Sequence, residues 1–139
     1  MSIGRFVFAM LLSALSSMAA AASSSDLIVE AEKYWSTGQL GPAQSAFEAA
    51  VAAQPEALTP LLRLAGFQLA NQQTSASIDN YRKIISQAPN NSTAWIGLGL
   101  AYLHSGQPEL ARAALAEAVR VDPSRQEKIA PLIAKLDAR

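Results

Sequence analysis

The chain has 139 residues, half of them apolar and few aromatic, and its 11 basic residues balance its 11 acidic ones. This length suits one small domain, and a neutral chain without a basic stripe gives no reason to expect a nucleic-acid partner. Because there is no cysteine, the sequence excludes disulfides, thiolate zinc sites and cysteine nucleophiles.

Residues 1–22 have the pattern of a secretory signal peptide. Arg5 is the only charged residue among them, and the apolar run Phe6–Leu15 is followed by small residues through Ala22. A short basic start, an apolar stretch and an alanine-rich site are the three parts of such a signal. We predict cleavage after Ala22, with 19–21 as competing sites, and export to the periplasm. An uncleaved anchor is the alternative, although it usually needs ~20 apolar residues. We expect no membrane span after cleavage.

The rest of the chain contains an internal repeat with a spacing of 34 residues. Three stretches align without a gap: 24–57, 58–91 and 92–125. The third begins with an apolar helical face, made of Trp95, Leu98, Gly99 and Tyr102. Gly106 is expected to end this helix and Pro108 to open a second one. The pattern therefore predicts three helix-turn-helix hairpins.

The same positions recur in all three copies. The second helix and end of the third copy carry Ala111, Leu115, Ala118 and Pro123. The first copy has Leu27, Ala31, Tyr34, Gly38, Ala43, Phe47, Ala50 and Pro55, and the second has Leu61, Leu64, Ala65, Ser77, Tyr81, Ile84 and Pro89. This pattern resembles the tetratricopeptide repeat family. The resemblance implies an all-α fold, a right-handed α-solenoid of three such hairpins plus a C-terminal capping helix.

Two glycines lie inside the first helix of the third copy, where each costs roughly 0.8–1 kcal/mol against alanine. The resemblance implies that the residue at Gly99 must be small so that the two helices of a hairpin can approach closely. Ala31 and Ala65 take this place in the other copies. Gly97 has no small counterpart, and we hypothesise that it opens room on the inner surface.

The second copy departs from the pattern at its inter-helix turn. Gln72 stands where the other copies have glycine. Because asparagine tolerates left-handed backbone geometry, we expect the neighbouring Asn71 to end the helix instead.

Residues 126–139 predict a terminal amphipathic helix. Ser124 and Glu127 have the spacing of a capping box, and Pro131 predicts a kink or a later start of the helix. Such a helix would cover the last exposed face of the solenoid, and a docking helix for a partner is the alternative.

No constellation of catalytic residues is evident. His104 is the only histidine, so there is no residue pair to hold zinc. We interpret His104 as a helix-capping or groove-lining residue, because a cation favours the end of a helix. No nucleophile elbow or phosphate-binding glycine loop occurs. We therefore expect a protein that is not an enzyme and that holds no metal or cofactor.

The resemblance implies that the first helix of each repeat lines a concave groove for extended peptides or partner helices. The groove residues inferred in this way are Ile28, Glu32, Trp35, Leu62, Arg63, Leu69, Ile96, Leu100, Leu103 and His104. Their apolar members could equally be ordinary hairpin packing, because both roles need apolar residues at helical spacing. Trp35 is the best candidate for a binding hot spot.

Some members of the family hold a peptide's terminal carboxylate with a clamp of basic and amide side chains. The matching places here are Ile28, Glu32, Arg63, Thr93 and Gly97, and only Arg63 is basic. The clamp is thus absent, which argues against an adaptor for acidic C-terminal tails.

The function that we infer is a scaffold or adaptor in the cell envelope, serving a secretion, pilus, export or maturation complex. Its expected partner is a protein helix or peptide. A periplasmic holding chaperone is the alternative, and a structural subunit that forms homo-oligomers is a third possibility.

Overall fold

The structure is a computed structural model that describes residues 22–138. It contains the α-helices α2 (Ser24–Ser36), α3 (Leu40–Ala53), α4 (Leu58–Ala70), α5 (Thr74–Gln87), α6 (Ser92–His104), α7 (Pro108–Val121) and α8 (Gln126–Asp137), and the 3₁₀ turn η1 (Pro123–Arg125). No strand occurs within the described range. The predicted right-handed all-α solenoid with its terminal helix is confirmed. Apart from Ala22, the predicted signal peptide lies outside the described residues.

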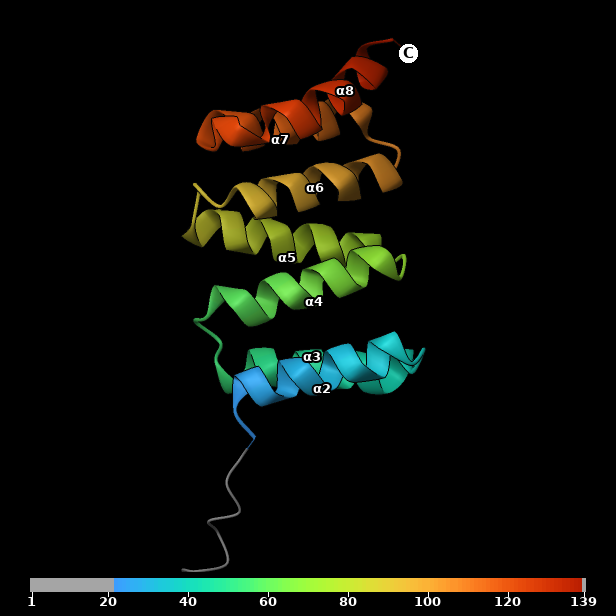
Figure 1. Ribbon diagram of the computed structural model, residues 1–139, viewed down its shortest axis with the longest axis vertical. Coiled ribbons are helices and arrows are strands. Elements are labelled where there is room, and N and C mark those ends of the chain that lie inside the picture. Colours follow the sequence, from blue (N-terminus) through green and yellow to red (C-terminus); the bar gives the residue numbers. More distant parts are fainter. Residues whose placement is uncertain (1–21, 139) are drawn as a thin grey trace, which may run out of the picture.

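The helices stack in chain order along the long axis of the molecule, with α2 and α3 at one end and α8 at the other (Figure 1). Helix α2 packs on α3, α4 on α5 and α6 on α7, and each pair packs on the next. The first helices of the pairs begin at residues 24, 58 and 92, and α8 begins at 126. Helix α8 therefore continues the 34-residue register as the first helix of a fourth pair.

Three apolar clusters fill the stack from end to end. The first lies between α2, α3 and α4 around Phe47 and Phe67, and the second joins α4, α5 and α6 around Ile84. In the third, Ile129 of α8 is buried beside Leu115 of α7. The buried Ile129 shows that α8 covers the last hairpin, as expected of a solenoid end.

The turns between the helices of each pair share one backbone conformation. Gly38 and Gly106 have φ values of +77° and +73°, and Gln72 has φ +62°. The expectation that Asn71 would supply the left-handed residue is wrong, because its φ is −104°. Asn71 is nevertheless the residue that caps the end of α4.

A repeated hydrogen bond explains why Gln72 takes this conformation. The residue after each turn donates its backbone N–H to a carbonyl five residues earlier: Gln39 to Tyr34, Gln73 to Gln68 and Gln107 to Tyr102, at 2.8–2.9 Å. This bond requires a positive φ at the residue before the donor. The position, rather than the residue type, therefore decides the conformation, at a cost of roughly 1–2 kcal/mol for a residue with a Cβ.

The two helix-interior glycines of α6 serve separate contacts. A Cβ on Gly99 would lie 2.8 Å from Cγ of Leu115, so the expected close approach of α6 and α7 is confirmed. A Cβ on Gly97 would overlap the ring of Tyr81, whose Oη would be 2.6 Å away. The hypothesis that Gly97 leaves open room is wrong, because the Tyr81 ring of α5 fills that space.

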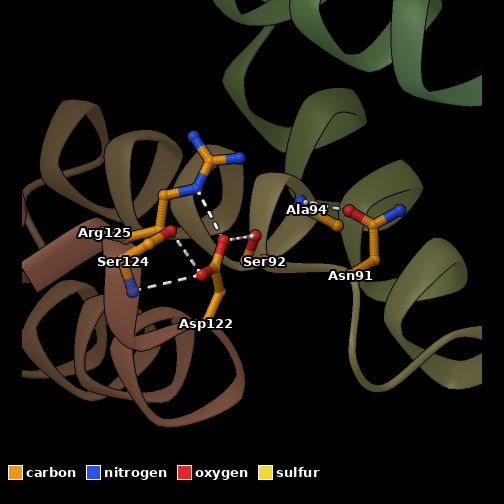
Figure 2. A network of polar contacts seen from close by, with 6 residues as sticks. All are labelled: Asn91, Ser92, Ala94, Asp122, Ser124 and Arg125. Atoms are coloured by element: carbon orange, nitrogen blue, oxygen red, sulfur yellow. Dashed lines mark hydrogen bonds and ion pairs between the residues drawn. The ribbon is translucent and has the colours of Figure 1, made fainter.

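A network of polar contacts around Asp122 joins α6, α7 and η1 (Figure 2). The Asp122 carboxylate accepts hydrogen bonds from the Ser124 hydroxyl (2.6 Å) and from Nε of Arg125 (3.0 Å). It also accepts a longer one, of 3.4 Å, from the Ser92 hydroxyl. The hydrogen bond from Ser124, followed by the bond from Arg125, lowers the pKa of Asp122 below its usual value.

This network replaces the predicted capping box. Ser124 donates its hydroxyl to Asp122, and the residue preceding α8 is Arg125, which makes no side-chain capping hydrogen bond. The capping-box prediction is wrong because Ser124 lies inside η1, so that Arg125 rather than Ser124 is in the N-cap position of α8. Helix α8 begins at Gln126 and runs through Pro131, so the proline does not delay its start.

Candidate functional site

The inner surface of the solenoid carries a hollow of about 490 Å³ formed by all three repeats. We call it the aromatic hollow, because four of its lining residues are Trp35, Phe47, Phe67 and Tyr81. Its rim includes the predicted groove residues Glu32, Leu62 and Arg63. Four of the ten predicted residues, Trp35 among them, therefore come together at this site.

The Trp35 ring is both a wall of the hollow and part of the packing. Its centroid lies 5.4 Å from that of Phe67 and 6.3 Å from that of Phe47, and both contacts are edge-on at 79°. The two phenylalanines are buried, whereas Trp35 is 36% exposed. The Trp35 ring therefore packs against two buried rings and also borders the hollow, and its role in partner binding stays a prediction.

The charges at the rim neutralise each other. Nη1 of Arg63 lies 3.4 Å from Oε1 of Glu32, and both side chains are largely exposed. An exposed pair of this kind contributes at most ~1 kcal/mol to stability. Its consequence for binding is that the only base among the five clamp places already has a carboxylate partner.

Tyr81 is one of the lining residues that the sequence pattern did not assign to the groove, together with Phe47, Thr59 and Phe67. It lies on α5, at the repeat position of Phe47, and is only 5% exposed. Its ring crosses α6 at Gly97, and its hydroxyl lies 3.8 Å from where a Cβ of Gly66 would be. Burial raises the pKa of Tyr81, so the phenol is neutral and can donate a hydrogen bond at physiological pH. The paired glycines 66 and 97, at facing positions of α4 and α6, were the signal that could have located it.

A second hollow, of about 530 Å³, lies at the turn end of the inner surface. We call it the turn-end hollow, and its lining includes Gly66, Leu69, Gln72 and His104. Nδ1 of His104 lies 2.9 Å from the Leu100 carbonyl in the last turn of α6. His104 thus contacts its own helix end and lines a hollow that adjoins the aromatic one at Gly66, while a role in partner binding stays a prediction.

The remaining predicted groove residues line neither of these hollows. Ile28 packs against the cluster around Phe47, and Ile96 packs against the cluster around Leu115. Leu100 and Leu103 are half-buried on α6.

The part of the chain that the structure describes contains no group of three or more acidic, histidine or cysteine side chains able to hold a metal ion. Within the same range, each helix is too short or too polar to cross a bilayer.

Comparison with protein families identifies the repeat. A tetratricopeptide repeat model matches residues 28–91, and a second model with that description matches 69–136, so that together they cover more than half of the chain. The chain belongs to the tetratricopeptide repeat family. No curated protein matches this tetratricopeptide repeat protein significantly in sequence.

Solved structures with the same fold include several other tetratricopeptide repeat domains. The first such domain of Spaghetti (RPAP3), bound to the HSP90 peptide SRMEEVD, has a TM-score of 0.75 and 14% identity, over 84% of this chain and 91% of that one. The TPR2B domain of yeast Sti1, in complex with pHsp70, has a TM-score of 0.75 and 19% identity, over 83% and 96%. The Sgt2 domain from Aspergillus fumigatus has a TM-score of 0.75 and 19% identity, over 88% and 82%. At these identities the likeness shows the fold alone.

Proposed function

We propose that this tetratricopeptide repeat protein is a non-enzymatic adaptor that binds a helix or peptide of a partner protein on its inner surface. The observation that carries the proposal is the partly exposed Trp35 ring, held edge-on against Phe47 and Phe67 at the wall of the aromatic hollow. Binding hot spots are enriched in tryptophan and lie in well-packed pockets where a side chain can be desolvated. A ring already fixed by its neighbours also loses little conformational freedom on binding.

Peptide binding by proteins of this fold supports the proposal, but the chemistry of the partner differs. The HSP90 peptide in the Spaghetti complex, SRMEEVD, is acidic near its end. Here Arg63 is paired with Glu32, and the other clamp places are Ile28, Thr93 and Gly97. A desolvated carboxylate would lack cationic partners, which is costly. We therefore infer a partner segment that binds through apolar and aromatic side chains.

We also propose that the protein acts in the cell envelope, as an accessory factor of a secretion, pilus, export or maturation complex. The support is the signal-peptide pattern of residues 1–22. Cell fractionation followed by N-terminal sequencing tests it. Recovery with the periplasmic fraction and a new N-terminus near residue 23 is expected. An intact N-terminus in the cytoplasmic fraction would refute the proposed location.

The adaptor function is tested by affinity purification from envelope extract with wild-type protein and Trp35→Ala, read by mass spectrometry. We expect one dominant partner with the wild type and its loss with Trp35→Ala. Val29→Ala is the matched control, because it removes a 66% exposed apolar side chain from the same helix outside the hollow, and it should retain the partner.

Stability must be measured beside binding, because Trp35 also packs on two buried rings. Circular dichroism should show a helical Trp35→Ala variant with a lowered melting temperature that still lies well above the temperature of the assay. Retention of the partner by a folded Trp35→Ala variant contradicts the proposal. A broad set of unrelated clients would instead identify a holding chaperone.

A further inference from the structure

The hydroxyl of Tyr81 is without a hydrogen-bond partner in the part of the chain that the structure describes. It makes no hydrogen bond within residues 22–138, although 95% of the residue is buried, and it borders the aromatic hollow. Water can reach this oxygen in the free protein, because no side-chain nitrogen or oxygen in the described range is both sealed from solvent and without a partner. A ligand that fills the hollow displaces that water. It must then supply a hydrogen bond itself or leave the phenol unsatisfied, which is expensive.

The repeat provides an internal comparison that sets this place apart. The positions equivalent to Tyr81 are Phe47 in the first repeat and Leu115 in the third, and neither has a polar atom. Tyr81 lies beside Gly66 and Gly97, and the positions one repeat earlier are occupied by Glu32 and Arg63. The Tyr81 hydroxyl therefore occurs together with two glycines beside it, Gly66 from the second repeat and Gly97 from the third.

From this combination we propose that the aromatic hollow binds a tyrosine side chain of the partner, whose phenol exchanges a hydrogen bond with the Tyr81 hydroxyl. The proposal rests on the adaptor function and names the residue that the hollow recognises. The partly exposed ring of Trp35 offers an aromatic surface to an incoming ring, and the buried rings of Phe47 and Phe67 hold it in place.

The alternatives fit the site less well. A phenylalanine would fill the same space but would leave the Tyr81 hydroxyl unpaired, and a site that bonds a hydroxyl disfavours the analogue that lacks it. A lysine or arginine would have to compete with Arg63 for Glu32. The ring of a phenol can contact the apolar lining of the hollow, and its hydroxyl can hydrogen-bond to the Tyr81 hydroxyl.

The experiment compares two small probes that differ by this single hydroxyl: N-acetyl-tyrosine amide and N-acetyl-phenylalanine amide. Each is titrated into the ¹⁵N-labelled protein purified after export, and the backbone amide signals of Gly66 and Gly97 are followed by NMR. We expect both probes to shift these signals, with the tyrosine derivative binding about fivefold more tightly, as one net hydrogen bond predicts.

The variant Tyr81→Phe removes one oxygen and should reduce the affinity ratio of the two probes to near one. Its fold should persist, because the hydroxyl makes no hydrogen bond inside the described protein, and an unchanged melting temperature checks this. Tyr102→Phe is the control, since Tyr102 also carries a hydroxyl but lies outside the aromatic hollow, and it should leave the ratio unchanged.

Equal affinity of the two probes, a preference that survives in Tyr81→Phe, or no shift at Gly66 and Gly97 would each overturn the inference. These results are separable from the adaptor function, which depends on partner loss in Trp35→Ala. If purification yields a partner sensitive to Trp35 while the probes show no preference, only the assignment of tyrosine fails.

Discussion

Gly97 on α6 and Tyr81 on α5 depend on each other. The missing side chain of Gly97 lets the tyrosine ring cross between the helices, and the ring fills the space that glycine leaves. The helix-propensity cost of Gly97, ~1 kcal/mol, is offset by burial of an aromatic ring. This contact also brings the Tyr81 hydroxyl to the inner surface, so one glycine serves both packing and the site.

Gly97→Ala should destabilise the protein, because the new Cβ would overlap the Tyr81 ring. Overpacking typically costs about 1–3 kcal/mol, and the better helix propensity of alanine returns up to ~1 kcal/mol of it. Chemical denaturation monitored by circular dichroism measures the net loss. The control is Gly41→Ala in α3, whose added Cβ meets nothing within 4 Å, and it should be neutral or slightly stabilising. Equal stability of Gly97→Ala and wild type would refute the packing role.

At the scale of the elements, the turns between paired helices impose their geometry on whatever residue occupies them. Gln72 has the same positive φ as Gly38 and Gly106, because the hydrogen bond from Gln73 to the Gln68 carbonyl needs it. A residue with a Cβ is strained in this region of backbone space, whereas glycine is not. Gln72 therefore makes the α4–α5 turn less stable than a glycine at the same place would.

Gln72→Gly should raise the free energy of unfolding by up to about 1 kcal/mol, since the relief of left-handed strain exceeds the extra entropy of glycine in the unfolded chain. The converse variant, Gly106→Gln, should lower it by a similar amount because Gly106 has φ +73°. Urea denaturation of both variants tests whether the free energy of unfolding rises in Gln72→Gly and falls in Gly106→Gln. A destabilised Gln72→Gly variant would mean that the glutamine side chain stabilises the fold by more than its left-handed backbone strain costs.

At the scale of the whole molecule, both ends of the solenoid are closed by side chains. The positions that are buried and apolar in α4 and α6, such as Leu64 and Leu98, are Asp26, Glu30 and Lys33 in α2, all of them exposed. At the other end, Ile133 of α8 occupies the position where the three hairpins have alanine or glycine. A bulky residue there prevents a further helix from approaching as closely as α7 approaches α6.

We therefore expect a monomer by light scattering across a range of concentrations. The double variant Glu30→Leu/Lys33→Phe restores the apolar residues that the second repeat has at these places, Leu64 and Phe67. These substitutions should expose apolar surface on α2, and the variant protein should therefore associate as its concentration rises. A wild-type protein that itself associates through α2 would contradict this account and favour a structural subunit.

Much of the fold could be predicted because the signals are local. The 34-residue register, the turn glycines and Pro108 all act within a few residues of the structure that they determine. The site was predicted in part: Glu32, Trp35, Leu62 and Arg63 do meet at one hollow. Tyr81 was not assigned to it, because its repeat position alone indicates packing.

The sequence by itself determined the order and pairing of the helices, since helical periodicity and turn chemistry are properties of short segments. Only the tertiary structure decided two other features: the ring of Tyr81 fills the space beside Gly97, and the Ser92 hydroxyl of α6 donates to Asp122 at the end of α7. In both cases, residues from different helices contact each other. The outcome depends on distances between residues that no spacing along the chain specifies.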